Sequence, residues 1–243
     1  MSSLEAGIEG VAPPHPDFHV EIGLSRADTS LPTMRDHIKR LATRLFTLGG
    51  YRGVSFGDLT EELGTTRANI HYHFGSKSGL AEEVLTDAAE AVLLRYRSIW
   101  TNPSTTLKVK LEQSFQFNEE TYRQYNTVNE GRIWSLITRF RLDMDVITPK
   151  MVAKLNEVTK VNEESIEEGV RLAIQNGELM PDAPVQAIES LISGVVHYAS
   201  LISQAPHDIR RLEHTYEALS VLIHRAYADP ASGRDSVNIP CQT

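Results

Sequence analysis

The sequence has very little cysteine. Cys241 is its only one, so no disulfide can form within the chain. This favours a reducing compartment, and we expect a cytoplasmic protein. The first ten residues, MSSLEAGIEG, carry glutamates and no apolar run. They lack the pattern of a secretory signal peptide.

Long hydrophobic runs are equally scarce. The most apolar stretch, 185–202, contains Gln186, Glu189 and His197, which indicates a buried helix and not a membrane span. The chain has no convincing alternating strand pattern, internal repeat or low-complexity tract. Helical periodicity runs through most of it. We therefore predict an all-α fold without membrane association.

Signatures of catalysis are missing as well. The sequence has no GxSxG, no Walker loop, no dinucleotide-binding glycine fingerprint and no HExxH. Acid pairs such as Glu163-Glu164 fall within helical segments and are typical of solvated faces, whereas a catalytic pair needs a desolvated pocket. We expect no catalytic residues, no metal and no cofactor, and not an enzyme.

Positive charge is in deficit overall but is unevenly distributed. The net charge is −8, yet residues 33–77 carry seven Lys and Arg against four Asp and Glu, a local charge of +3. A small basic module on an acidic chain suggests a polyanionic partner. The alternative is chance clustering of charges.

A first helix follows a proline-rich N-terminal segment. Residues 1–32 contain four prolines, scattered acids and no sustained period, which is typical of a flexible arm. Thr33 with Asp36 then opens a helix, because a threonine side chain can cap the first turn. Gly49-Gly50 ends it, since glycine accepts the left-handed cap geometry.

Two shorter helices come next. Ser55 with Asp58 opens one of them and Gly64 stops it. A second helix is expected at about 66–73. Two short helices joined by a glycine turn are typical of a helix-turn-helix, whose second helix enters the major groove of DNA. The expected buried positions of that second helix are Ala68 and Ile70.

Longer helices are expected beyond this motif. Ser76 opens one that runs to about Trp100, where Asn102-Pro103 breaks it. Thr148-Pro149 begins a helix of about 28 residues that ends before Gly177. The last two helices are expected over 185–202 and 207–227.

A specific run of residues extends across the helix-turn-helix into the following helix. Its most distinctive part is the spacing His71-Tyr72-His73-Phe74…Lys77…Leu80 after the glycine turn. Over 33–84 the sequence resembles the TetR family of bacterial transcriptional regulators. The other residues that carry the resemblance are Ile38, Ala42, Leu45-Phe46, Gly50-Tyr51, Ser55, Leu59, Leu63-Gly64 and Ile70.

The resemblance implies a DNA-binding surface. A helix N-terminus beside an ammonium suits phosphate, arginine can bond guanine in a bidentate way, and asparagine can do the same with adenine. The residues that match the family's DNA-contacting positions are Ser55, Thr65, Thr66, Arg67, Asn69, His71, Tyr72, His73 and Lys77.

Two positions depart from the family pattern. His71 stands where tyrosine is usual, and an imidazole can still donate to a phosphate. Thr60 stands where alanine is usual, and we expect its hydroxyl to bond the backbone of its own helix. His71 and His73 could instead bind a metal, but a spacing of two places them on different helix faces. Tyr72 could be a core residue, although Ile70 and Phe74 already supply the buried stripe.

The resemblance also implies a homodimer, because one short recognition helix makes few contacts and two heads can read a palindromic DNA operator. The last two helices carry wide apolar stripes suited to a four-helix seam. The alternative is that these stripes serve only the core of one chain. The predicted interface residues are Ile192, Val195, Val196, Ala199, Leu212, Tyr216, Leu219 and Ile223.

A small-molecule pocket is the last implied feature. Aromatic residues and methionines gather in the middle helices, and most of them are expected to be ordinary core residues. The polar candidates include Arg132 and Arg139. The predicted ligand-binding residues are Phe115, Asn118, Tyr122, Trp134, Phe140, Met144 and His197.

These observations predict a three-helix DNA-binding head at 33–78 and a helical ligand-binding and dimerisation domain at 79–229, between an arm at 1–32 and a flexible tail at 230–243. The expected function is a ligand-responsive, dimeric DNA-binding transcriptional regulator, a repressor released from its operator by a small-molecule effector. The alternative is an all-α ligand carrier or enzyme whose helix-turn-helix is vestigial. DNA binding would weaken steeply with salt, and a carrier would show no such dependence.

Overall fold

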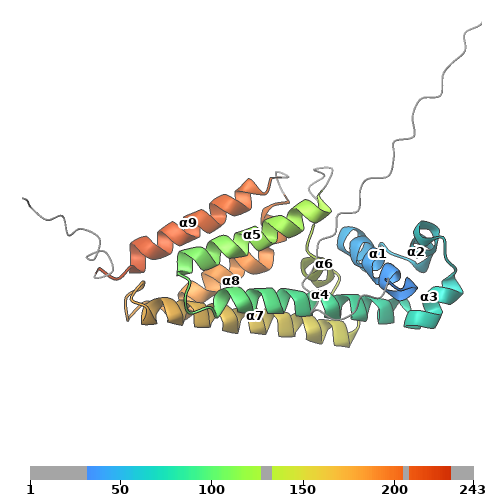
Figure 1. Ribbon diagram of the computed structural model, residues 1–243, viewed down its shortest axis with the longest axis horizontal. Helices are drawn as coiled ribbons and strands as arrows, with labels where there is room; N and C mark the ends of the chain where they lie inside the picture. Colours follow the sequence, from blue (N-terminus) through green and yellow to red (C-terminus); the bar gives the residue numbers. More distant parts are fainter. Residues whose placement is uncertain (1–31, 127–132, 205–207, 231–243) are drawn as a thin grey trace, which may run out of the picture. The chain divides into compact units, whose positions relative to one another are not determined.

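The computed structural model describes residues 32–126, 133–204 and 208–230. The predicted arm and tail lie almost wholly outside these ranges, as does Arg132. Within them the chain forms nine α-helices and one isolated β-bridge between Leu179 and Ala228, which confirms the all-α prediction (Figure 1). The helices are α1 (Met34–Gly49), α2 (Phe56–Leu63), α3 (Arg67–Phe74), α4 (Lys77–Trp100), α5 (Leu107–Tyr125), α6 (Leu136–Leu142), α7 (Pro149–Gln175), α8 (Val185–Ile202) and α9 (Arg210–Tyr227).

The predicted helix starts are confirmed by their caps. Side chains of Thr33, Ser55, Ser76 and Thr148 accept hydrogen bonds from backbone amides in the first turns of α1, α2, α4 and α7. Each cap satisfies amides that have no partner within the helix. Gly64 ends α2 with φ of 61°, a left-handed conformation that glycine adopts without a steric penalty.

The helix-turn-helix shares its core with helices far along the chain. Buried residues of α1, α2, α3 and the first half of α4 pack in one cluster with Leu136 and Phe140 of α6 and with Met151 and Leu155 of α7. The Phe46 and Phe140 rings lie 5.5 Å apart. The first three helices are therefore held by α4, α6 and α7 together.

A second core fills the opposite end of the described residues. Helices α4 and α7 run along each other, and α5, α8 and α9 cover their far halves (Figure 1). Trp100, Ile166 and Val170 are central to this cluster and are fully buried. Three of its polar side chains are linked by hydrogen bonds, because Asn118 donates to the Tyr216 hydroxyl at 2.9 Å and accepts from Tyr96 at 3.4 Å.

Helix α8 is the most apolar element. Its 18 residues have a mean hydropathy of 1.3, enough by length and composition to cross a membrane, and a third of that window is buried inside the chain. Helices α7 and α9 pack against it. A core helix of a soluble protein passes the same test of length and hydropathy. Its outward face carries Leu191 and Tyr198, which are 59% and 57% exposed.

Candidate nucleic-acid interface and ligand pocket

Helix α3 is fastened along one edge and presents the other to solvent. Ile70 is fully buried and Phe74 nearly so, one turn apart on the same face. Tyr72 points the other way and is 84% exposed, so its interpretation as a surface residue is confirmed. The burial predicted for Ala68 is wrong: Ala68 is exposed. An eight-residue helix buries one i, i+4 pair, and position 68 lies about 200° around the axis from Ile70.

The first turn of α3 is ordered by its own side chains. The Thr66 hydroxyl caps the helix by accepting from the Asn69 amide at 3.2 Å. The Asn69 side-chain amide donates to Thr65 Oγ1 at 2.9 Å, which fixes its orientation. Arg67 is exposed, and its guanidinium lies against Gly57 of α2, where an added Cβ would approach within 3.2 Å. This arginine therefore lies between the two helices of the motif.

The two histidines of α3 are held by different neighbours. His71 is exposed, its Nδ1 lies 2.7 Å from the Gly75 carbonyl oxygen, and its ring meets Phe56 edge-on at 4.8 Å. His73 is half-buried, with its ring beside that of Tyr72. Among the described residues, no group of three His, Cys, Asp or Glu is placed to hold a metal ion.

Ser55 has a structural task at the start of α2. Its hydroxyl accepts from the Gly57 and Asp58 amides and donates to the Asp58 carboxylate at 2.9 Å. The Ser55 backbone amide, which donates to the Asp58 carboxylate at 2.7 Å, and secondly the Ser55 hydroxyl lower the pKa of Asp58. A phosphate contact by Ser55 would therefore compete with its capping role and meet the Asp58 charge. The hydroxyl of Thr60 donates to the Gly57 carbonyl at 2.8 Å, as expected.

Lys77 opens α4 beside this surface. Its ammonium lies 4.5 Å from the centre of the Tyr51 ring, which attracts a cation through its negative face. Partial burial lowers the pKa of Lys77, and the charges of Asp143 and Asp58 oppose that effect. Phosphate would supply a stronger counter-charge at the same helix N-terminus.

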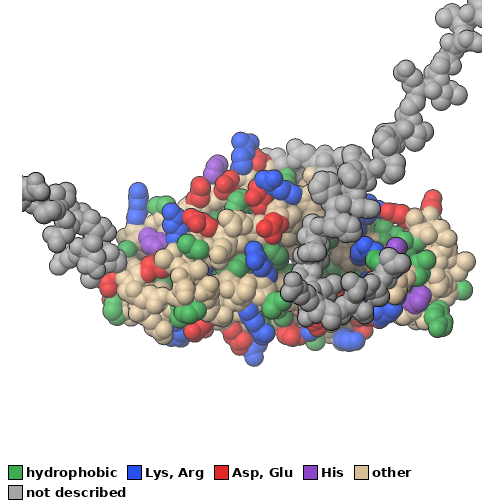
Figure 2. All heavy atoms as spheres, in the orientation of Figure 1, with side chains coloured by type: hydrophobic (Ala, Val, Ile, Leu, Met, Phe, Trp, Pro, Cys, Tyr) green, Lys and Arg blue, Asp and Glu red, His purple; other side chains and the backbone are tan. Residues whose placement is uncertain are grey.

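Most of the basic charge in 33–77 is already neutralised. Arg35 pairs with Glu83, Lys39 with Asp87, Arg44 with Glu62, and Arg52 with Asp145. Among the described residues, Arg40, Arg67 and Lys77 are the basic side chains of this segment without an ion pair. Arg67 and Lys77 belong to the α3 surface. Figure 2 shows histidine and hydrophobic side chains gathered at that end of the chain.

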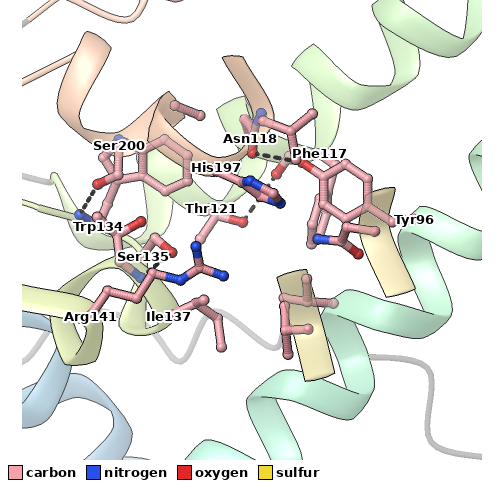
Figure 3. Close-up of a pocket in the computed structure, with 16 residues that line it drawn as sticks. Tyr96, Phe117, Asn118, Thr121, Trp134, Ser135, Ile137, Arg141, His197 and Ser200 are labelled. Atoms are coloured by element: carbon pink, nitrogen blue, oxygen red, sulfur yellow. Dashed lines mark hydrogen bonds between the residues drawn. The ribbon is translucent and has the colours of Figure 1, made fainter. Parts of the chain in front are cut away.

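A cavity of about 70 Å³ lies among α4, α5, α6, α7 and α8 (Figure 3). It is lined by three of the predicted ligand-binding residues, Asn118, Trp134 and His197. Trp134 is fixed by two serines of α8 and its end: its amide donates to Ser200 at 3.0 Å and its indole nitrogen to Ser203 at 2.8 Å.

The other four predicted ligand residues lie elsewhere, which corrects the prediction. Phe115 packs against the Tyr216 ring, and Tyr122 packs behind Trp134 without reaching the cavity. Phe140 belongs to the core beneath α1, and Met144 is 44% exposed. Aromatic content alone does not distinguish a cavity wall from a core, because both are apolar.

Sequence reasoning missed the only charged residue of the cavity lining and two other residues with polar groups. Arg141, Asn162 and Tyr96 line it together with apolar side chains such as Phe117 and Ile137. The sequence held one clue to Arg141: it lies two residues after Arg139 on one short apolar helix, so the two arginines lie on different faces. Arg139, a predicted polar candidate, instead donates to the Leu48 carbonyl oxygen at 2.6 Å.

The cavity changes the acid–base properties of its polar residues. Burial first, and the positive charge of Arg141 second, lower the pKa of His197 to about 4, so this imidazole is neutral at pH 7. Burial also lowers the pKa of Arg141, which stays charged.

The predicted dimer interface is wrong in its choice of face. Seven of the eight residues are buried within the single chain, and Val195 is half-buried against the same core. These seven residues are at most 9% exposed, so they have little area left to bury against a partner. The stripes serve the core of one chain, as the alternative interpretation held. The exposed apolar side chains of these helices are Leu191 and Tyr198 on α8 and Val221 and Leu222 on α9.

Comparison with known proteins agrees with this geometry. The family described as bacterial regulatory proteins, tetR family, matches residues 38–84, which cover α1 to the start of α4. The HTH-type transcriptional repressor KstR2 of Mycolicibacterium smegmatis is 29% identical over 93 residues, 37% of this chain and 45% of that protein. The HTH-type transcriptional regulator LmrA of Bacillus subtilis is 37% identical over 59 residues, 24% of this chain and 31% of that protein. The chain thus spans less than half the length of these curated relatives.

Similarity of fold extends much further along the chain. A TetR-family transcriptional regulator from Agrobacterium tumefaciens superposes with a TM-score of 0.66 at 18% identity, covering 80% of this chain and 97% of that one. A TetR regulator from Legionella pneumophila gives 0.62 at 20% identity, covering 80% and all of that chain. Residues 38–84 thus match the tetR family of bacterial regulatory proteins, and the described chain has the fold of TetR-family regulators.

Proposed function

We propose that this protein is a dimeric, DNA-binding transcriptional repressor whose affinity for DNA is set by a small molecule. The observation that carries the proposal is the exposed edge of α3, where Tyr72 is 84% exposed beside Arg67 and Lys77 while Ile70 and Phe74 anchor the opposite edge. Two cations without ion pairs make this edge locally positive, which suits a polyanionic partner. The family match on this segment and the names of the two relatives support DNA as that partner.

The exposed side chains divide into two roles. Lys77, at the N-terminus of α4, suits a phosphate and would position the head without reading sequence. Arg67, in the first turn of α3, and the solvent-facing Tyr72 are placed to reach base edges. The amide of Asn69 is already turned towards Thr65, so its reading of adenine would require that bond to break.

Two copies would be needed for tight binding, and an exposed apolar face suits their contact. Leu191, Gly194 and Tyr198 follow one another at helical spacing on α8, all exposed, and no atom lies within 4 Å of a Cβ added at Gly194. Val221 and Leu222 continue this apolar character on α9. We propose that this face, and not the predicted stripe, forms a four-helix interface with a second copy.

Helix α6 is placed to couple the cavity to the DNA-binding head. One face, with Ile137 and Arg141, lines the cavity. The other face and its C-cap hold the corner between α1 and α2: Arg139 donates to Leu48, and Asp143 accepts from the Tyr51 amide at 2.7 Å. A side chain added at Gly50 would collide with Asp143, so this contact is close. We propose that an effector which displaces α6 also displaces this corner and shifts the population away from DNA.

The proposal is tested by selecting bound fragments from a genomic DNA library and measuring their affinity by fluorescence anisotropy at two salt concentrations. Tyr72→Ala with Lys77→Ala is expected to weaken specific binding by about 10- to 100-fold. Lys160→Ala, an exposed lysine on α7, is the matched control and should bind as wild type. Affinity should fall steeply with salt.

A ligand carrier or enzyme with a vestigial helix-turn-helix would behave differently. A folded, dimeric carrier or enzyme would enrich no DNA fragment in the selection. Alternatively, it would bind all fragments with similar affinity, and the double substitution would leave that affinity unchanged. Either result would overturn the regulator proposal.

A further inference from the structure

The cavity holds one formal charge. Among its lining residues Arg141 is the sole Lys, Arg, Asp or Glu, and the walls are otherwise apolar or neutral polar. Figure 3 shows the Arg141 guanidinium directed into the open space, with His197 on the opposite side. In a chain of net charge −8, this is a locally positive interior.

The guanidinium is under-satisfied. One of its terminal nitrogens donates to the Thr159 hydroxyl and, at 3.4 Å, to the Leu155 carbonyl oxygen, while Nε is buried and has no partner among the residues that the structure describes. No ion pair of Arg141 occurs in the described part of the chain. Glu163 is near enough for the Arg141 charge to lower its pKa, but burial outweighs this and raises it. The Arg141 side chain is half-buried, and withdrawing a cation from water without an ion pair is unfavourable.

Two further polar atoms around the cavity lack partners. His197 Nε2 and Asn162 Oδ1 are buried and form no hydrogen bond with the described residues, and Asn162 as a whole is 3% exposed. Buried polar groups in folded proteins are nearly always bonded, so unpaired ones facing a cavity indicate a ligand. They stand on α8 and α7, whereas Arg141 stands on α6, so three helices contribute to one polar cluster.

We propose that this cavity binds a small organic monoanion with an apolar body, and that Arg141 binds its carboxylate. The planar guanidinium fork matches a carboxylate in a bidentate way. A single cation neutralises a single negative charge, so a monoanion is favoured over a dianion. The walls of Phe117, Ile137 and Val158 suit a ring or a branched chain. At ~10–15 Å³ for each water, the cavity has room for about five waters, which limits the ligand's size.

Assigning this anion as the effector rests on the proposed regulatory function, but the binding itself does not. We therefore test binding without DNA, by isothermal titration of the full chain with pairs of probes that have nearly the same shape, one an anionic carboxylate and the other its neutral amide. The pairs are isobutyrate with isobutyramide, benzoate with benzamide, and phenylacetate with phenylacetamide. Phenyl phosphate is added to compare a dianion.

The acid of at least one pair is expected to bind about tenfold or more tightly than its amide, as charge-assisted hydrogen bonds predict. Arg141→Gln should reduce that preference to less than about threefold. Arg171→Gln, which removes a surface arginine of α7 paired with Glu167, is the matched control and should keep it. Circular dichroism of each variant establishes that it is folded.

Three results would overturn the proposal: no acid binding with a Kd below about 10 mM, amides that bind as well as acids, or a preference that persists in Arg141→Gln. Tighter binding of phenyl phosphate than of any acid would overturn the monoanion assignment. DNA affinity is measured separately. If the wild type binds an acid but no DNA, the regulator proposal is refuted and the anion site stands. If it binds DNA but no acid, the anion site is refuted and the regulator proposal stands.

Discussion

Histidine 197 makes the stability of this protein depend on pH in a calculable way. Its pKa in the folded chain is about 4, below the ordinary value of 6.5, because the ring is buried and faces Arg141. Between those two values the unfolded chain binds the proton and the folded chain does not. Stability from this group is therefore complete above about pH 7 and is lost as the pH falls.

The size of the loss follows from the two pKa values. Lowering the pH from 7.5 to 5 protonates His197 almost fully in the unfolded chain and hardly at all in the folded one, which costs about 2 kcal/mol of unfolding free energy. The result is robust, because a folded pKa one unit higher changes it by only about 0.4 kcal/mol. A bound carboxylate on Arg141 would raise the pKa of His197 and reduce the loss.

The assay is urea unfolding of wild type and His197→Gln at pH 7.5, 6.5, 5.5 and 5, at one protein concentration. Other titrating groups cancel in the difference between the two proteins. From pH 7.5 to pH 5, the unfolding free energy of wild type should fall by about 2 kcal/mol relative to that of His197→Gln. His214→Gln, at an exposed histidine of α9, is the control. A difference that is constant to within about 0.5 kcal/mol would refute the reasoning.

Three further outcomes are expected. Lys110→Met should lower the unfolding free energy, measured in urea, by about 2–3 kcal/mol. The reason is that the buried ammonium donates to the Ile99 and Asn102 carbonyls at the end of α4. A change under about 0.5 kcal/mol would contradict this. Leu191→Glu with Leu222→Glu should yield a folded monomer by light scattering, and an unchanged mass would refute the proposed interface. Asp143→Ala should accelerate hydrogen exchange of the Tyr51 amide, whose acceptor it removes, and unaltered protection would argue against the α6 contact.

Local signals predicted the helices well, because caps and glycine stops act within a few residues. The starts at Thr33, Ser55, Ser76 and Thr148 needed no information beyond their own first turn. The exposure of Tyr72 followed from helical spacing relative to Ile70 and Phe74. Burial of Ala68 was predicted wrongly because an eight-residue helix offers too few apolar positions to define a face.

It was harder to predict which side of α8 faces the core, because apolar residues occur all around this helix. The stripe through Ile192 and Val196 and the stripe through Leu191 and Tyr198 are both regular, and periodicity cannot say which meets the chain's own core. The cavity residues were missed for a related reason. Arg141 and Asn162 are 21 positions apart and line one cavity because α6 and α7 pack against each other and against α4.

The sequence by itself determined the helix starts, their caps, the helix-turn-helix and the resemblance of that segment to the TetR family, since each depends on residues close together in the chain. Only the tertiary structure decided which apolar face stays outside, which arginine of α6 enters the cavity and which cations remain unpaired. These depend on contacts between residues distant in sequence. The pairing of Arg35 with Glu83 across α1 and α4 shows why charge counted along the chain overstated what the head offers to DNA.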